Sequence, residues 1–101
     1  MIDQIFFISS AYLIGSLSFG IIVTKVFNLS DPRTIGSKNP GATNVLRTGN
    51  KLAAILTLLG DIFKATFVVQ TSILFGLNDL EMMQVCLAVF IGHTYPIYYK
   101  F

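Results

Sequence analysis

The chain has 101 residues, of which 53% are hydrophobic and only 12% charged, and its formal net charge is +2. This share of charge is about half that of an ordinary soluble domain, so the composition favours a bilayer over a soluble core. The positive charge is too small and too scattered to indicate a nucleic-acid partner. We therefore expect one all-α, polytopic membrane domain over residues 1–101, with three transmembrane helices and a short interfacial helix.

The first apolar segment runs from Gln4 to Thr24 without a charged residue. At about 1.5 Å per residue it covers a hydrocarbon layer of roughly 30 Å, which predicts a transmembrane helix over about 4–26. Asp3 stands where a cleavable signal peptide needs a positive charge, so we expect the segment to remain in the mature chain. Its small residues either let a second helix approach closely or shape a substrate groove. They are Gly15, Ser16, Ser18 and Gly20.

A polar loop follows over 28–50, and its stretch from Gly36 to Arg47 has the composition of an anion site. It combines hydroxyls, amides, two glycines and two cations with no acidic residue. Asn39 and Pro40 suit the N-cap and the first position of a short helix over about 40–48, whose free N–H groups would face an anion such as phosphate. The side chains of Ser37 and Arg47 are expected to face the same anion, Arg47 through a planar fork. The supporting loop residues are Asn39, Gly41, Thr43 and Asn44.

Two further spans are predicted over about 51–77 and 81–99, separated by a short acidic turn. Asp61 and Lys64 lie one helical turn apart in the second span, where they either form an ion pair that orients the helix or belong to a site. His93 near the end of the third span is either a hydrogen-bonded packing residue or a catalyst. Pro96 is expected to kink or end that helix, and Lys100 to mark the membrane surface.

The distribution of charge predicts the orientation. The turn after the second span carries Asp79 and Glu81 and no cation, so the N-terminus should lie outside, with the first loop and the C-terminus in the cytoplasm of a bacterial inner membrane. The first loop, by contrast, carries five cations against Asp31 alone: Lys25, Arg33, Lys38, Arg47 and Lys51.

A metal site is not expected, since one histidine and one cysteine cannot supply an ordinary ligand set.

With these elements in place, the chain resembles the N-terminal half of the bacterial acyl-phosphate:glycerol-3-phosphate acyltransferases, a family of integral-membrane enzymes. The specific motif is Gly-Ser-Lys-Asn-Pro-Gly-Ala-Thr-Asn-Val-Leu-Arg over 36–47. Weaker matches are Gly-Ser-Leu-Ser-Phe-Gly over 15–20, Leu-Leu-Gly-Asp-Ile-Phe-Lys over 58–64 and Gly-His-Thr-Tyr-Pro over 92–96. Lys38, Ser18 and Ala65 depart from the family pattern, which usually has glycine, proline and glycine there.

The resemblance implies acyl transfer from acyl phosphate to the 1-hydroxyl of glycerol-3-phosphate, which gives lysophosphatidic acid for phospholipid biosynthesis. The family's essential serine and arginine fall on Ser37 and Arg47, which would bind the glycerol phosphate. No cofactor and no acyl-enzyme are expected, because acyl phosphate is already activated. The resemblance also implies part of a seven-span fold, with two further motifs expected beyond Phe101 and a missing C-terminal half as a possible partner. His93 does not stand in for the histidine of the third family motif.

Two other readings remain open. The chain could be an inactive membrane fragment or an interaction subunit. It could also be a small multi-span transporter, for which Asp61 is the only buried acid available for proton coupling, although Lys64 lies one turn away.

Overall fold

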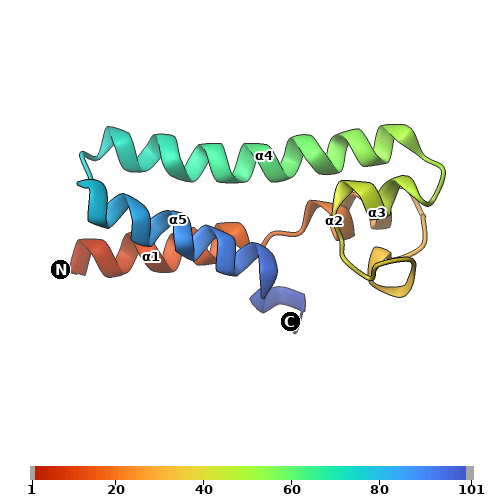
Figure 1. Cartoon of the computed structure of the whole chain (residues 1–101), viewed down its shortest axis with the longest axis horizontal. Coiled ribbons are helices and arrows are strands. Elements are labelled where there is room, and N and C mark those ends of the chain that lie inside the picture. The colour runs from red at the N-terminus through yellow and green to blue at the C-terminus, as the bar shows by residue number, and fades with distance from the viewer. Residues whose placement is uncertain (1, 100–101) are drawn as a thin grey trace. The chain divides into compact units, whose positions relative to one another are not determined.

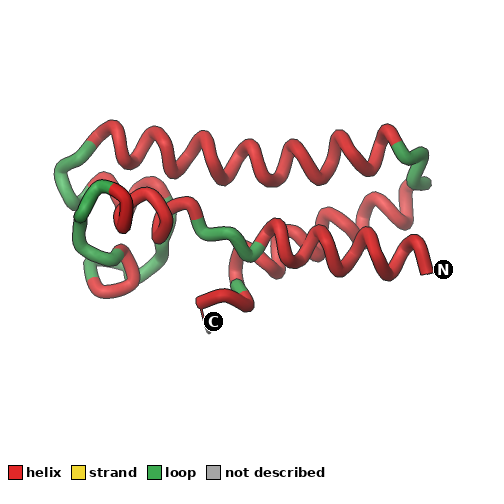
Figure 2. The backbone as a smooth tube through the Cα atoms, turned by 180° about the vertical axis from the view of Figure 1, so that it is seen from behind, coloured by secondary structure: helices red, strands yellow, loops and turns green. Residues whose placement is uncertain are grey.

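The computed structural model describes residues 2–99, which form helices joined by loops and contain no strand (Figures 1 and 2). Lys100, expected at the membrane surface, lies outside the described residues. Three segments are long and apolar enough to cross a membrane, namely Asp3–Val26, Lys51–Leu74 and Asp79–Tyr99. The prediction of an all-α fold with three spans and a short extra helix is confirmed. The elements are α1 (Ile2–Gly15), α2 (Phe19–Val26), the 3-10 turn η1 (Pro32–Thr34), α3 (Ala42–Leu46), α4 (Lys51–Leu74), α5 (Asp79–Thr94) and the 3-10 turn η2 (Ile97–Tyr99).

The chain divides into two compact units. The first combines the residues up to Leu17 with those from Phe63 onward, and we call it the helical unit. The second is Ser18–Ile62, which we call the loop unit. Helix α4 contributes its first half to the loop unit and its second half to the helical unit.

Within the helical unit, α1 and α5 run parallel and side by side (Figure 1). Hydrogen bonds join them in the same order along both helices: Gln4 to Gln84 at 2.8 Å, then the Tyr12 hydroxyl to the Tyr95 carbonyl at 2.8 Å. The glycines allow the two backbones to meet. A Cβ on Gly15 would collide with the backbone of Val89, and one on Gly92 with the backbone of α1 at Tyr12. For Gly15, the packing interpretation of the small residues is therefore confirmed.

The prediction of one continuous first helix is wrong. Helix α1 ends at Gly15 and α2 begins at Phe19, and the segment between them appears as a loop in Figure 2. Ser18 is the N-cap of α2, because its side chain accepts a hydrogen bond from the Ile21 N–H. The carbonyls of Gly15 and Leu17 accept hydrogen bonds from the Lys64 ammonium, at 2.9 and 2.8 Å. The backbone groups freed by the break thus have partners inside the protein, which an unwound segment at membrane depth requires.

The boundaries of the other spans also differ from the predicted ones. Helix α4 ends at Leu74, and Gly76 turns the chain with a φ of 74°. Helix α5 already begins at Asp79, because Asn78 and Glu81 form a capping box that satisfies its first N–H groups. It ends at Thr94, two residues before Pro96, which confirms the expectation that Pro96 kinks or ends this helix, and the chain then turns into η2.

Large apolar side chains remain exposed along the outer faces of all three spanning segments. Phe6 on α1, Phe63 on α4 and Phe90 on α5 are each more than half exposed. Apolar exposure on this scale is unusual for a soluble monomer and fits side chains that face lipid.

Candidate functional site

The loop unit is built around four small buried side chains that bring α2, α3 and the start of α4 together. Val23, Val45, Ala53 and Ala54 form this cluster, with Phe27 and Leu29 packed against it. Gly20 on α2 lies directly against the backbone of Pro40, where a Cβ would collide with the proline carbonyl. The same helix therefore supports both ends of the polar loop.

Helix α2 ends in a Schellman motif, which sends the chain into the loop. Asn28 has a left-handed backbone with φ 56°, and the Leu29 N–H donates to the Thr24 carbonyl at 2.8 Å. Asparagine is one of the few residues that adopt this conformation readily, so the sequence is locally suited to the turn.

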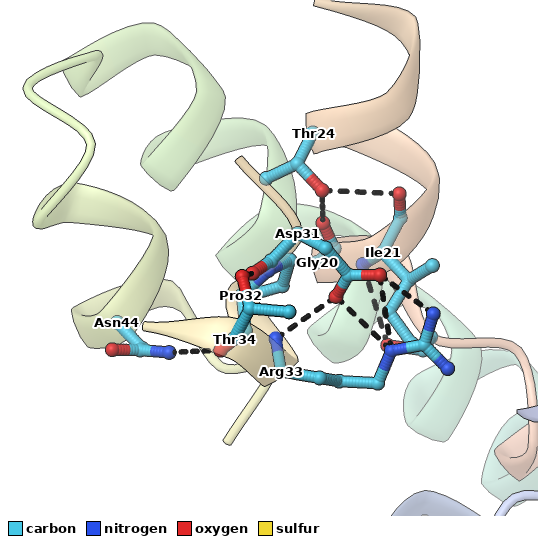
Figure 3. Close-up of polar contacts among 9 residues, drawn as sticks. Gly20, Ile21, Thr24, Asp31, Pro32, Arg33, Thr34 and Asn44 are labelled. Carbon is cyan, nitrogen blue, oxygen red and sulfur yellow. Dashed lines mark hydrogen bonds and ion pairs between the residues drawn. The ribbon is translucent and has the colours of Figure 1, made fainter. Parts of the chain in front are cut away.

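The acidic residue of the loop is held by its neighbour Arg33 (Figure 3). The Asp31 carboxylate accepts hydrogen bonds from the Arg33 backbone N–H at 2.9 Å and from Arg33 Nε at 3.0 Å, and the ion pair closes at 2.6 Å. The hydrogen bond from the Arg33 side chain is the main cause that holds the pKa of Asp31 below its usual value of 3.8. Because Arg33 compensates this acid, the loop keeps a net positive charge.

Asn44 is the residue that fixes the shape of the loop. It is only 2% exposed, and its amide nitrogen donates to the carbonyls of Pro32 at 2.6 Å and Ile35 at 3.1 Å. Figure 3 shows the bond to Pro32. The amide oxygen accepts from the Ser37 N–H at 3.3 Å. One buried side chain thus joins α3 to three points of the preceding loop.

The short helix begins later than predicted. Helix α3 spans Ala42–Leu46, and its N-cap is Gly41, which makes no side-chain cap. Asn39, predicted to be the cap, instead uses its backbone N–H to donate to Ser37 Oγ at 3.4 Å. Pro40, predicted at the first helical position, lies in the extended segment against Gly20. Five residues are too few for a strong helix dipole, so the anion site cannot rest on the helix N-terminus as the sequence suggested.

The structure brings the Arg47 side chain to the backbone next to Ser37. A Cβ built on Gly36 would lie 2.7 Å from Arg47 Cδ and 3.0 Å from Arg47 Nε, so the arginine side chain crosses over Gly36. Only glycine leaves room for this crossing, and its φ of 49° also favours glycine. Ser37 and Arg47 are both exposed. The Arg47 side chain therefore lies against the residue that precedes Ser37, and both side chains are exposed.

The other supporting residues have different positions. Asn39 and Thr43 are exposed, whereas Gly41 is half-buried at the start of α3. The importance of Gly36 and Asn44 exceeds what the sequence suggested. A glycine directly before the serine, and an asparagine directly before an apolar valine, were the sequence signals available.

Lys64 and His93 come together in the helical unit. Lys64 is 4% exposed, and its ammonium lies 2.9 Å from His93 Nδ1 in addition to its contacts with the two carbonyls of the helix break. This hydrogen bond agrees with the view of His93 as a packing residue. Asp61 is half-buried on the part of α4 that belongs to the loop unit. Its pairing with Lys64 and a direct role of Asp61, Lys64 or His93 in a site stay predictions.

Comparison with known proteins identifies the family. A family model described as glycerol-3-phosphate acyltransferase matches residues 5–101. The chain belongs to this family. Two proteins named glycerol-3-phosphate acyltransferase, from Burkholderia orbicola and Burkholderia multivorans, are each 58% identical to the chain over 91 residues. The match covers 90% of this chain but only 44% and 43% of those relatives, so the chain spans less than half of their length.

A solved family structure has the same fold. The crystal structure of PlsY, described as an integral membrane glycerol 3-phosphate acyltransferase in its glycerol 3-phosphate form, superposes with a TM-score of 0.88 at 33% identity. The match covers 98% of this chain and 50% of PlsY. Together with the three apolar helical segments, this likeness supports a multi-pass membrane protein with part of the family fold.

Proposed function

We propose that this chain carries the glycerol-phosphate site of an enzyme that transfers an acyl group from acyl phosphate to the 1-hydroxyl of glycerol-3-phosphate, giving lysophosphatidic acid. The observation that supports the proposal is the crossing of the Arg47 side chain over Gly36, the residue that precedes Ser37. Membership of the acyltransferase family supports the substrate, because the solved relative is described in its glycerol 3-phosphate form.

The two side chains offer complementary contacts to one phosphoryl group. The guanidinium of Arg47 can donate two parallel hydrogen bonds to phosphate oxygens and supplies a permanent positive charge. The Ser37 hydroxyl can donate a third hydrogen bond. Asn44 keeps the backbone at Ser37 in place through its bond to the Ser37 N–H. The loop therefore binds the substrate through a prearranged set of donors, which lowers the entropy cost of binding.

Acyl transfer on this loop requires no covalent enzyme intermediate. Acyl phosphate already contains a good leaving group, so holding the glycerol hydroxyl against its carbonyl supplies a large part of the rate acceleration. Cations near the departing phosphate stabilise the charge that develops on it. Ser37 acts in this scheme as a ligand of glycerol-3-phosphate and not as a nucleophile.

The orientation of the site follows from the charge of the loops. Lys25, Lys38, Arg47 and Lys51 lie in or beside one loop, so the positive-inside rule assigns that loop to the cytoplasm of a bacterial inner membrane and the N-terminus to the outside. Water-soluble glycerol-3-phosphate then reaches the loop from the cytoplasm, while acyl phosphate reaches it from the lipid.

The proposal is tested by acyl transfer from acyl phosphate to labelled glycerol-3-phosphate in purified membranes. The chain is assayed alone and together with the remaining part of the Burkholderia orbicola relative, beyond the matched region. We expect lysophosphatidic acid in at least one of these preparations, and a loss of about 100-fold in Arg47→Ala, because a charge-assisted bidentate contact contributes about 3 kcal/mol.

Lys51→Ala provides the matched control. It removes one exposed cation at the start of α4 and should leave the rate within about twofold, as expected for a surface charge. Membrane insertion of each variant is followed by protease accessibility. If Arg47→Ala transfers acyl groups as fast as the unchanged protein, or if no preparation forms product, the proposed function is wrong.

A further inference from the structure

Lys38 has a backbone conformation that its side chain does not favour. Among the described residues, Asn28 and Lys38 are the two non-glycine residues with a positive φ, 56° and 63°. For a residue with a Cβ this left-handed region carries a steric cost, and asparagine tolerates it better than lysine.

The two positions differ in what the lysine or asparagine contributes. Asn28 ends α2 in the Schellman motif described above, in which a left-handed residue is the rule. Lys38 follows a turn that is closed by its own N–H, which donates to the Ile35 carbonyl at 2.8 Å. In that turn Gly36 already supplies a positive φ. The family pattern usually has glycine at residue 38, and glycine adopts this φ without strain, so the conformation belongs to the loop and the lysine side chain is what this chain adds directly after Ser37.

The charge of Lys38 is available for binding. The side chain is exposed and follows Ser37 directly in the chain, so a phosphate held by the Ser37 hydroxyl lies within reach of a flexible four-carbon stem. The acid of this loop, Asp31, is engaged by Arg33. An ammonium here therefore adds positive charge to the site without being neutralised by that carboxylate.

We propose that Lys38 is a substrate-binding residue of this loop, a third contact for the phosphate group held by Ser37 and Arg47. The inference rests on the proposed function. Lys38 would attract phosphate monoesters as a flexible point charge, whereas Arg47 would bind them through two parallel hydrogen bonds of fixed geometry. The expected size follows from Coulomb attraction between an ammonium and a phosphate dianion about 7 Å apart in water: about sevenfold in affinity without salt and about threefold at about 0.1 M salt.

The test measures binding of glycerol-3-phosphate to the 101-residue chain in lipid nanodiscs, at low and high salt. Lys38→Gln removes the charge and keeps a side chain, Lys38→Arg keeps the charge, and Lys38→Gly removes both the charge and the backbone strain. We expect about threefold weaker binding for Lys38→Gln and Lys38→Gly near 0.1 M salt, a smaller difference at high salt, and normal binding for Lys38→Arg. Lys38→Gly should also melt at the same temperature as the unchanged protein or higher, because glycine is unstrained at this φ.

Two control variants isolate the two properties of Lys38. Asn28→Gly changes the other left-handed position and should leave glycerol-3-phosphate affinity unchanged. Lys51→Gln removes an exposed lysine from the same unit and should weaken binding less than Lys38→Gln. Titrations with inorganic phosphate, glycerol and an acyl phosphate identify the ligand group. Weakening for phosphate-bearing ligands but not for glycerol supports the contact, and the acyl phosphate titration shows which substrate Lys38 serves.

The outcomes separate this inference from the proposed function. If Arg47→Ala loses binding while Lys38→Gln binds as tightly as the unchanged protein, only the role of Lys38 is overturned. Equal weakening by Lys51→Gln also overturns it, because the effect is then a general property of loop charge. If the unchanged protein binds no glycerol-3-phosphate, or Arg47→Ala binds as well as the unchanged protein, the proposed function fails and the role of Lys38 fails with it.

Discussion

The two units of this chain are held together by different physical means. In the helical unit, α1 and α5 meet at glycines whose backbones touch the opposite helix, so the packing depends on the absence of side-chain volume at these positions. In the loop unit, the amide of Asn44 joins three points of an irregular segment, so the shape of the loop depends on buried hydrogen bonds. The contrast shows that this membrane protein keeps the outer faces of its helices apolar while a buried polar side chain holds an irregular loop in one shape.

Of the substitutions that test this difference between the two units, Asn44→Asp should have the largest effect. The new side chain has the same shape but cannot donate to the Pro32 and Ile35 carbonyls, and a carboxylate next to them would be repelled. Leaving two buried acceptors without a donor should destabilise the loop unit by about 3 kcal/mol. Hydrogen exchange should rise in residues 32–47 and glycerol-3-phosphate binding should be lost.

The control for Asn44→Asp is the helical unit. Exchange in α1 and α5 should stay unchanged, because the hydrogen bonds from Asn44 to Pro32, Ile35 and Ser37 lie within the loop unit. Equal loosening of both units would show that they do not differ in the way described.

The opposite change, Gly15→Ala, should disturb the helical unit at the point where α1 meets the backbone of Val89. Because a backbone atom cannot swing aside as a side chain does, the helices must separate slightly, which should cost about 2 kcal/mol. Thermal unfolding of the chain in nanodiscs measures the loss. Ser9→Ala, at an exposed position of the same helix, is the matched control and should leave the melting temperature close to that of the unchanged protein.

The smallest effect is expected from pH, through Asp31. Its pKa is lower in the folded protein than in the unfolded chain, so the ion pair with Arg33 stabilises the loop unit above about pH 4, and the contribution is lost as the pH falls through the folded pKa. The pair is partly exposed, with side chains 43% and 35% accessible, so the contribution should be only about 0.5 kcal/mol. Asp31→Asn should remove this part of the acid dependence. An unchanged dependence in that variant would assign it to other carboxylates.

The sequence predicted the helices and the motif residues of the loop better than the contacts that fix their ends and positions. Asn50 caps the start of α4, since its side chain accepts from the Ala53 N–H at 2.9 Å. The start of α5 was missed, although Asn78 followed by Glu81 is a recognisable capping box. The break after Gly15 could not be predicted from hydropathy, because the segment has no charge to mark it. It depends on Lys64, which is distant in sequence.

The loop shows the same limit. The pattern of serine, asparagines and arginine indicated an anion site, but attributed it to a helix N-terminus that α3 is too short to provide. The crossing of Arg47 over Gly36 is a tertiary contact, and no local propensity encodes it.

The central claim is that Ser37 and Arg47 bind one phosphate, and solid-state NMR of the chain in nanodiscs tests it directly. Arg33 and Arg47 are the two arginines of the sequence, so Arg33→Lys leaves Arg47 as the single source of a guanidinium 15N signal. At saturating glycerol-3-phosphate, we expect the 31P nucleus to dephase this signal and also the 13Cβ signal of Ser37, which Ser37→Ala identifies by its disappearance. Bound glycerol-3-phosphate that dephases neither signal, or only one of them, would contradict the account.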